Sequence, residues 1–156
     1  MEPPSSGFVT VLNESGRSIV TEPVADAVSV ALRLHGRSPR EVNVLLTTDE
    51  QVQALNRAYR SLDAPTDVLT FVADEDANGD IAIAVPYAER QAERRAVSLE
   101  QELGYLAIHG ALHLVGFDDE DDTDRAEMMR EMNRAAMAAG LPPDEAWTSI
   151  LHGDAV

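Results

Sequence analysis

Two histidines in the C-terminal third of the chain have the spacing of metal ligands. His109 and His113 are four residues apart, so on a helix both imidazoles lie on one face and can reach the same cation. Gly116 can adopt the left-handed conformation that ends a helix and turns the chain back, which makes Asp119 the first candidate for a third ligand. Two His and a carboxylate leave room for a bound water, as in catalytic zinc sites. The alternative is that the two histidines form only a polar stripe on the helix.

Composition sets the outer bounds of the fold. A chain of 156 residues with 44% hydrophobic content predicts one compact domain, which we place at 8–151, after a disordered lead-in at 1–7. The chain has no cysteine, which excludes disulfides and thiolate metal sites. It has no apolar run of membrane-spanning length and no signal-peptide pattern, so we expect a cytoplasmic protein with no membrane partner.

The charge of the chain is strongly acidic. Its 28 acidic and 12 basic residues give a net charge of −16, and every basic residue is Arg. Such a field repels nucleic-acid phosphates unless arginines gather in one place, and it suits a basic protein partner. Six arginines could supply a local basic face if folding brings them together: Arg33, Arg37, Arg40, Arg90, Arg94 and Arg95.

Hydrophobic periods and turn residues predict the elements. Strands are expected at 8–12, 41–47, 68–72 and 81–85, the last two joined as a hairpin by the acidic turn 74–80. Helices are expected from Thr21-Glu22-Pro23 to Gly36, at 48–59, from Pro86, from Ser98 through the histidines, and at 123–139. The predicted fold is α+β: a small mixed four-stranded sheet packed with about five helices, one of them a zincin-like metal helix.

The same periods predict which side chains face the core. Thr48 and Ser98 are expected to cap the second and fourth helices. His35 and His152 belong to no motif and are expected at the surface. The side chains expected to be buried are Val52, Leu55 and Tyr59 in the second helix, Leu103, Ala107, Gly110 and Leu114 in the fourth, and Met129, Met132 and Ala136 in the fifth.

Three blocks of sequence share the order and spacing of a known family. They are Leu55-Asn56-Arg57-Ala58-Tyr59-Arg60 with Pro65-Thr66-Asp67-Val68-Leu69-Thr70-Phe71, then Gly79-Asp80-Ile81-Ala82-Ile83, then the segment from His109 to Asp119. In these blocks the chain resembles the YbeY family of bacterial endoribonucleases, which is associated with ribosomal RNA maturation and ribosome quality control. The resemblance implies His109 and His113 as metal ligands and Arg60 as an active-site arginine. The third ligand of the family is usually a His, where this chain has Asp119, which remains a competent ligand.

The resemblance also implies a function. It implies a metal-dependent endoribonuclease that cleaves single-stranded RNA during ribosomal RNA maturation, at the 3′ end of 16S rRNA, and in ribosome quality control. One divalent ion per chain is expected, with Zn²⁺ favoured, and the expected partners are an rRNA precursor and the ribosome or its small-subunit proteins. Arg60 could orient the scissile phosphate, because a guanidinium can hold two phosphate oxygens. The general base stays open between Asp67, Asp118 and Glu102, and the attacking group between water and the RNA 2′-hydroxyl.

Two other functions stay open at this point. The segment around the histidines also resembles the metzincin peptidase motif, which has ligands at the same offsets. That motif needs a general-base Glu directly after the first His, where this chain has Gly110. In the second alternative the metal is structural, and the domain is a binding module on the ribosome or on a basic protein.

Overall fold

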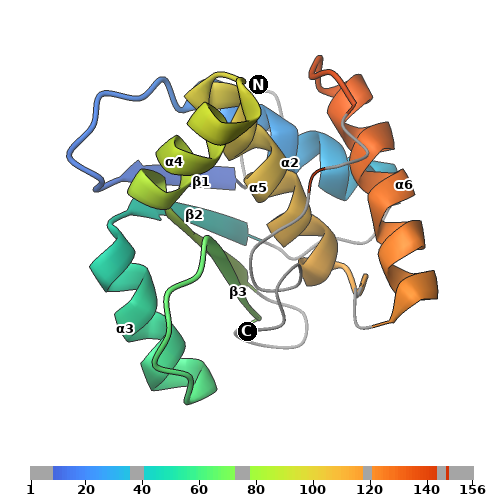
Figure 1. Ribbon diagram of the computed structural model, residues 1–156. Helices are drawn as coiled ribbons and strands as arrows, with labels where there is room; N and C mark the ends of the chain where they lie inside the picture. Colours follow the sequence, from blue (N-terminus) through green and yellow to red (C-terminus); the bar gives the residue numbers. More distant parts are fainter. Residues whose placement is uncertain (1–8, 36–40, 73–77, 118–120, 144–146, 148–156) are drawn as a thin grey trace.

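The strands form one mixed sheet in the order β1-β2-β4-β3. The structure, a computed structural model, describes residues 9–35, 41–72, 78–117, 121–143 and 147 (Figure 1). Strands β1 (Val9–Asn13), β2 (Glu41–Thr47) and β4 (Asn78–Ala84) are parallel, and β3 (Val68–Val72) pairs antiparallel with β4 at one edge. The predicted α+β class, the mixed four-stranded sheet and the hairpin pairing are therefore confirmed.

The part of the chain that the structure describes contains five helices, of which the last packs on two of the others. They are α2 (Glu22–His35), α3 (Asp49–Arg60), α4 (Val85–Arg95), α5 (Leu99–Leu114) and α6 (Asp122–Ala138). Two of them begin at the predicted caps: the hydroxyl of Thr48 accepts from the backbone N–H of Gln51 at 3.2 Å, and that of Ser98 accepts from Gln101 at 3.0 Å. Each bond satisfies an amide of the first turn that has no partner within the helix. None of the described helices is long and apolar enough to span a membrane.

The two faces of the sheet are covered unequally. Because side chains alternate along a strand, Val42 and Val44 lie on the face that packs against α2 and α5, whereas Leu45 lies on the other face. On that second face α3 places Val52 against Leu69 and packs over part of the sheet. Figure 1 shows α3 on the opposite side of the sheet from α5. Part of the second face is therefore left open beside α3.

Helix α5 is buried on all sides. Every residue from Glu102 to Leu112 is buried, because α5 packs against α2, α4 and α6 as well as against β3 and β4. The predicted stripe of Leu103, Ala107 and Gly110 is only part of this buried surface, and Leu114 is partly exposed. A helix enclosed in this way holds its side chains in fixed positions.

Strand β4 lies earlier in the chain than predicted. It runs Asn78–Ala84 rather than 81–85, because all seven of its residues pair with β2, from Glu41 opposite Asn78 to Thr47 opposite Ala84. Val85 instead begins α4, one residue before the predicted start at Pro86. Residues 74–77 of the predicted acidic turn, the predicted lead-in 1–7 and Gly36 lie outside the described residues.

Two predicted inward side chains are placed differently. Tyr59 is 71% exposed, because it lies in the last turn of α3 at the rim of the open part of the sheet. The buried polar residue of α3 is Asn56, whose amide donates to the carbonyl of Ala64 at 2.9 Å and holds the loop that follows. In α6, Met128 is buried and Met129 only partly so, a shift of one position around the helix.

His35 was expected at the surface, but the structure buries most of its side chain. Its side chain is only 14% exposed, with Nε2 3.4 Å from a carboxylate oxygen of Glu131, because the end of α2 packs against α6. Its ring also packs edge-on against Phe117, with centroids 4.8 Å apart. His152 lies outside the described residues.

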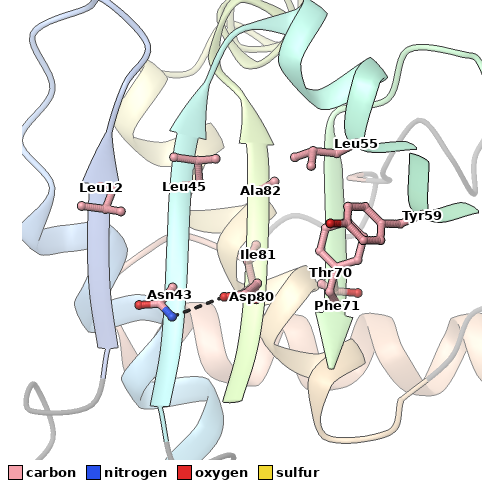
Figure 2. A pocket seen from close by; sticks show the side chains of 10 residues that line it. All are labelled: Leu12, Asn43, Leu45, Leu55, Tyr59, Thr70, Phe71, Asp80, Ile81 and Ala82. Carbon is pink, nitrogen blue, oxygen red and sulfur yellow. Dashed lines mark hydrogen bonds between the residues drawn. The ribbon is translucent and has the colours of Figure 1, made fainter. Parts of the chain in front are cut away.

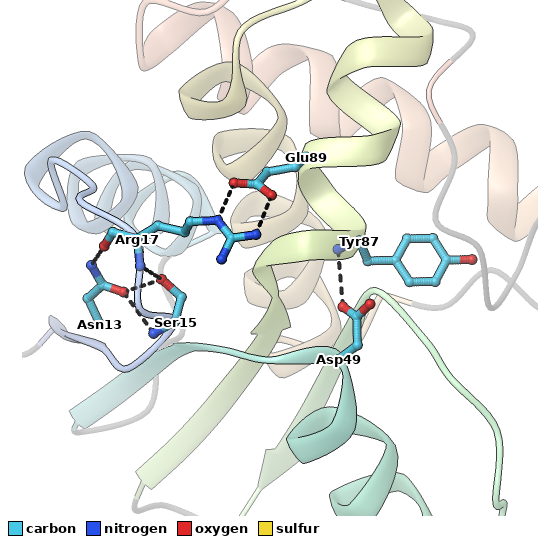
Figure 3. A network of polar contacts seen from close by, with 6 residues as sticks. All are labelled: Asn13, Ser15, Arg17, Asp49, Tyr87 and Glu89. Atoms are coloured by element: carbon cyan, nitrogen blue, oxygen red, sulfur yellow. Dashed lines mark hydrogen bonds and ion pairs between the residues drawn. The ribbon is translucent and has the colours of Figure 1, made fainter.

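A polar network holds α4 against the loop after β1 and the start of α3 (Figure 3). Arg17 donates to both carboxylate oxygens of Glu89, at 2.8 and 2.9 Å, and these hydrogen bonds lower the pKa of Glu89. Asp49 accepts from the backbone N–H of Tyr87 at 3.1 Å, and burial raises the pKa of the Tyr87 phenol. Helix α4 is thus tied at its first two turns before it packs against α5.

Candidate metal centre

The last turns of α5 bring the imidazoles of His109 and His113 together. The two Nε2 atoms are 3.2 Å apart, with ring centroids at 4.7 Å and ring planes at 84°. His109 is buried and His113 partly exposed, so one ring anchors the pair in the core and the other meets the surface. The spacing of one helical turn, from which the sequence predicts this pairing, is what places the two rings on one face.

The end of α5 is a tight turn centred on a glycine. Gly116 has a φ of +105°, in the left-handed region, as the sequence predicts. Its N–H donates to the carbonyl of His113 at 3.1 Å, and the N–H of Phe117 donates to that of Leu112 at 3.0 Å. These are the two bonds of a Schellman motif, which satisfies the last carbonyls of a helix and reverses the chain.

The turn also fixes the tautomer of His113. The carbonyl oxygen of Phe117 lies 3.0 Å from Nδ1 of His113, and because a carbonyl can only accept, Nδ1 carries the proton. In the neutral imidazole Nε2 then has a lone pair, which points toward His109. Two nitrogens bound tetrahedrally to one Zn²⁺ at 2.0 to 2.1 Å would be about 3.3 Å apart. The pair therefore fits a divalent ion in spacing, and His113 fits it also in tautomer and outer hydrogen bonding.

His109 is supported by a buried aromatic and carboxylate pair. The ring of Trp147 lies 5.2 Å from that of His109, and its indole N–H donates to Glu102 at 2.9 Å. Arg95 completes the group, with Nε 4.0 Å from the other oxygen of Glu102 and its guanidinium 5.6 Å from the indole centroid. Glu102, one of the three candidates for the general base, is fully buried. It accepts the hydrogen bond of the indole that packs on His109. Sequence reasoning missed Trp147, because nothing in its spacing connects it with the histidines.

The carboxylates predicted around the histidines are placed as follows. Asp118 and Asp119 lie outside the described residues, and within the described ranges no third His, Cys, Asp or Glu joins the pair. Asp67 is buried next to β3, where its carboxylate accepts from Gln91 of α4 at 3.3 Å and its carbonyl accepts from the N–H of Ala84. The last turn of α5 lies at the other end of the β3–β4 hairpin, where Leu114 packs against Gly79.

Arg60 is the last residue of α3 and is exposed. The next residue, Ser61, ends the helix with a φ of 57°, and its N–H donates to the carbonyl of Asn56. Helices α3 and α5 pack on opposite faces of the sheet, and both contact the edge strand β3. The structure therefore places Arg60 and the histidine pair on two faces that meet at this edge.

Within the described ranges, three of the six arginines predicted to form a basic face have polar partners, and one of these is Arg94, which donates to Gln91 at 2.5 Å. Arg90 pairs with Asp49 at 2.9 Å, and Arg95 belongs to the Glu102 group. Arg37 and Arg40 lie outside the described residues.

Comparisons with known proteins give one consistent result. A family model described as endoribonuclease YbeY matches residues 11–139, a range that includes Arg60, both histidines and Asp119. The chain is 43% identical over 122 residues to the endoribonuclease YbeY of Maricaulis maris, covering 76% of each chain. It is 33% identical over 154 residues to that of Shouchella clausii, covering 86% of this chain and 96% of the relative. Among solved structures it resembles the solution structure of TM1509 from Thermotoga maritima, with a TM-score of 0.62, 30% identity, and coverage of 85% of this chain and 89% of that one.

Proposed function

We propose a function from one premise: the chain belongs to the endoribonuclease YbeY family. The chain is an endoribonuclease, and its substrate is single-stranded RNA in the maturation of ribosomal RNA. The observation that carries the site assignment is the pair of Nε2 atoms 3.2 Å apart, with Nδ1 of His113 held by the Phe117 carbonyl. Two imidazole nitrogens at this distance have the spacing of two ligands of one divalent ion, and Nε2 of His113 has the lone pair that a ligand needs.

The proposed cofactor is one divalent ion per chain, with Zn²⁺ favoured, held by His109, His113 and Asp119. Asp119 follows Phe117, whose carbonyl contacts His113, by two residues in sequence. When bound, such an ion lowers the pKa of a coordinated water and neutralises charge on a phosphodiester. The general base is assigned to neither Asp67 nor Asp118: the first is occupied at the far end of the hairpin, and the second lies beside the third ligand in sequence.

Contacts within the chain orient both histidine rings in the absence of a ligand. The Phe117 carbonyl keeps a proton of His113 on Nδ1, so that in the neutral imidazole Nε2 is the atom that can donate to a metal. The indole of Trp147, held by Glu102, packs on the ring of His109 and limits its rotation. Rigid placement of both rings reduces the ordering cost of binding.

Arg60 is proposed to hold the phosphate backbone of the RNA. A guanidinium donates two parallel hydrogen bonds to phosphate oxygens, and Arg60 is exposed at a helix end where it can meet a ligand. Because α3 and α5 lie on opposite faces of the sheet, an RNA that contacts both Arg60 and the histidines must cross the edge of β3.

Peptide hydrolysis is disfavoured by the surroundings of Gly110. A side chain at this position would point at the sheet, because its Cβ would lie 2.9 Å from Cγ2 of Ile81 and 3.2 Å from that of Thr70. A general-base Glu has no space there. The metzincin alternative therefore lacks its base for a steric as well as a chemical reason.

The proposed setting is the cytoplasm, on an rRNA precursor at the 3′ end of 16S rRNA and on the ribosome or its small-subunit proteins. A net charge of −16 opposes binding to naked RNA and favours a basic protein partner that brings the substrate close. Cleavage of isolated RNA should therefore be slow at low concentration and should rise when moderate salt screens the repulsion.

Metal content and RNA cleavage, measured on the same preparations, test the proposal. The wild type should contain about one divalent ion per chain and should lose cleavage with a chelator, and His113→Ala should lose both. Arg60→Ala should keep metal and fold but cleave about a hundredfold more slowly, about 2 to 3 kcal/mol. Arg134→Ala is the matched control, since Arg134 is an exposed arginine on α6 paired with Glu131. Equal cleavage rates in Arg60→Ala and Arg134→Ala would show that Arg60 has no role in cleavage. Full cleavage by metal-free protein would show that the metal has none.

A further inference from the structure

The open part of the sheet beside α3 is a groove of about 810 Å³ (Figure 2). It is open because α3 is one helix, about 10 Å wide, and it packs on β3 and β4, while the strands of the sheet stand about 4.8 Å apart. The floor beyond the helix is formed by Leu45 and Ala82, and Leu12 at its far side is 51% exposed. The groove lies on the face of the sheet opposite to α5 and the histidines.

Two aromatic rings stand at the rim of this groove. Tyr59 of α3 and Phe71 of β3 have ring centroids 5.3 Å apart, with planes at 60°. Tyr59 is 71% exposed, although its position in the helix faces the sheet. A large aromatic ring left open to solvent beside an apolar floor offers a flat surface on which another ring can stack.

The floor contains one polar pair. Asn43 and Asp80 are directly opposite each other in the β2–β4 ladder, and the Asn43 amide donates to the Asp80 carboxylate at 3.3 Å. Figure 2 shows both side chains at the end of the groove that carries Phe71. An amide and a carboxylate together provide donors and acceptors of the kind that read the edge of a nucleobase.

The charges around the groove decide which part of a nucleotide enters it. Asp80 places a negative charge at the floor, which repels phosphate but accepts hydrogen bonds from amino groups. Two exposed arginines of α3 flank the rim residue Tyr59 in sequence: Arg57, which pairs with Asp63 at 3.5 Å, and Arg60. A base directed inward and a phosphate directed toward the rim would match both charges.

We propose that this groove binds one unpaired nucleobase of the RNA, stacked on Tyr59 and hydrogen-bonded to the Asn43–Asp80 pair. The carboxylate acceptor favours bases with an exocyclic amino group, so adenine, cytosine and guanine bind better than uracil. The inference rests on the proposed function for the identity of its ligand as RNA, but it concerns a different face of the sheet from the histidines. It assigns to the groove the choice of base, and to the histidine side the chemistry.

Binding without cleavage tests this proposal. Cytidine 5′-monophosphate, uridine 5′-monophosphate and ribose 5-phosphate are titrated in turn into the full chain, with chelator present, and amide chemical shifts are followed by NMR. The cytidine nucleotide should shift the amides of β2, β4 and the last turn of α3, the uridine nucleotide should bind several-fold more weakly, and ribose 5-phosphate should leave the groove unchanged. Equal binding of all three would overturn the proposal, because the base would then contribute nothing.

Matched variants separate stacking from folding. Tyr59→Ala should weaken binding of an eight-nucleotide single-stranded RNA about tenfold, whereas Tyr59→Phe, which keeps the ring, should stay within about twofold of the wild type. Asp80→Asn should reduce the preference for cytidine over uridine. Met137→Ala, at a 62% exposed apolar residue of α6, is the control for loss of surface area and should change neither.

The outcomes also separate this site from the proposed function. If nucleotides bind as predicted but no RNA is cleaved, the groove proposal stands and the nuclease proposal fails. If RNA is cleaved while Tyr59→Ala binds and cleaves like the wild type, the groove proposal fails alone. A concentration-dependent dimer that Tyr59→Ala abolishes, with no nucleotide binding, would show that the groove is instead covered by a second copy of the chain.

Discussion

The ring of His113 and the backbone carbonyl of Phe117 are joined by a 3.0 Å hydrogen bond across the turn that ends α5. The bond links a backbone feature, the left-handed Gly116, to a chemical one, the lone pair on Nε2 of His113. The shape of the helix end therefore determines which nitrogen of the histidine faces its neighbour His109.

Gly116→Ala should disturb this turn and the metal affinity together. A Cβ at a φ of +105° should lower the free energy of unfolding by about 1 to 2 kcal/mol, although no atom lies within 4 Å to oppose it. Displacement of the Phe117 carbonyl should also weaken zinc binding about tenfold, measured by competition with a chromogenic chelator.

Gly140→Ala is the matched control for Gly116→Ala. Gly140 follows α6, has a φ of +87° and equally open surroundings. It should cost similar stability in urea denaturation and leave zinc affinity unchanged. Identical zinc affinities in the two variants would show that the turn at Gly116 does not influence metal binding.

The fluorescence of Trp147 should report metal binding directly. It is the only tryptophan of the chain, and its ring lies 5.2 Å from that of His109. Addition of Ni²⁺, a quenching ion that imidazole binds well, should reduce the emission with a midpoint at the binding constant. His113→Ala removes one ligand without touching the indole and should move the midpoint to at least tenfold higher concentration. Quenching that is the same in both proteins would place the ion elsewhere.

Trp147→Phe should reveal the cost of removing one hydrogen bond from the buried carboxylate of Glu102. Phenylalanine retains a ring near His109 but has no N–H for Glu102, which is fully buried. The loss should be about 1 to 3 kcal/mol of unfolding free energy in urea denaturation. Adding Glu102→Gln to this variant should recover part of the loss, because a neutral amide is cheaper to bury than a carboxylate. A double variant less stable than the single one would contradict this account.

The assignment of the third ligand rests on Asp119 rather than Asp118. Asp119→Ala should lower the metal content of the purified protein far more than Asp118→Ala. Asp119→His should bind Zn²⁺ more tightly than the wild type, because imidazole is the softer ligand. The reverse order of metal loss would transfer the role to Asp118.

The Arg17–Glu89 pair should contribute to stability in a defined pH range. The hydrogen bonds from Arg17 hold the pKa of Glu89 below its ordinary value of 4.5. The contribution is therefore complete above pH 4.5 and is lost as pH falls through the lower folded-state pKa. The melting temperature of the wild type should exceed that of Glu89→Gln by a constant amount near neutrality, and the difference should shrink in acid. A difference in melting temperature that grows as the pH falls would contradict a stabilising role of the ionised Glu89.

Local rules predicted much of the fold and part of the candidate site. Thr48, Ser98 and Gly116 each act on residues three or four positions away, so the sequence nearby contains the whole interaction. Other features depend on pairings between distant segments. Asn43 lies opposite Asp80 only because β2 pairs with β4 in one particular register. Trp147 contacts His109 although they lie 38 positions apart in sequence. Tyr59 was predicted to be buried because its helical period is correct, but a period cannot show how much of the sheet lies beneath the last turn of a helix.

The sheet stands between the groove and the histidines, and its edge strand β3 contacts the helices of both sides. With each helix layer about 10 Å thick, a strand of RNA that reaches both sites follows a path on the order of 20 Å around that edge. The nucleotide that is recognised and the bond that is cut are then several positions apart. An RNA that occupies both proposed sites would therefore be cut at a fixed distance from the recognised nucleotide, and the edge of the sheet at β3 would set that distance.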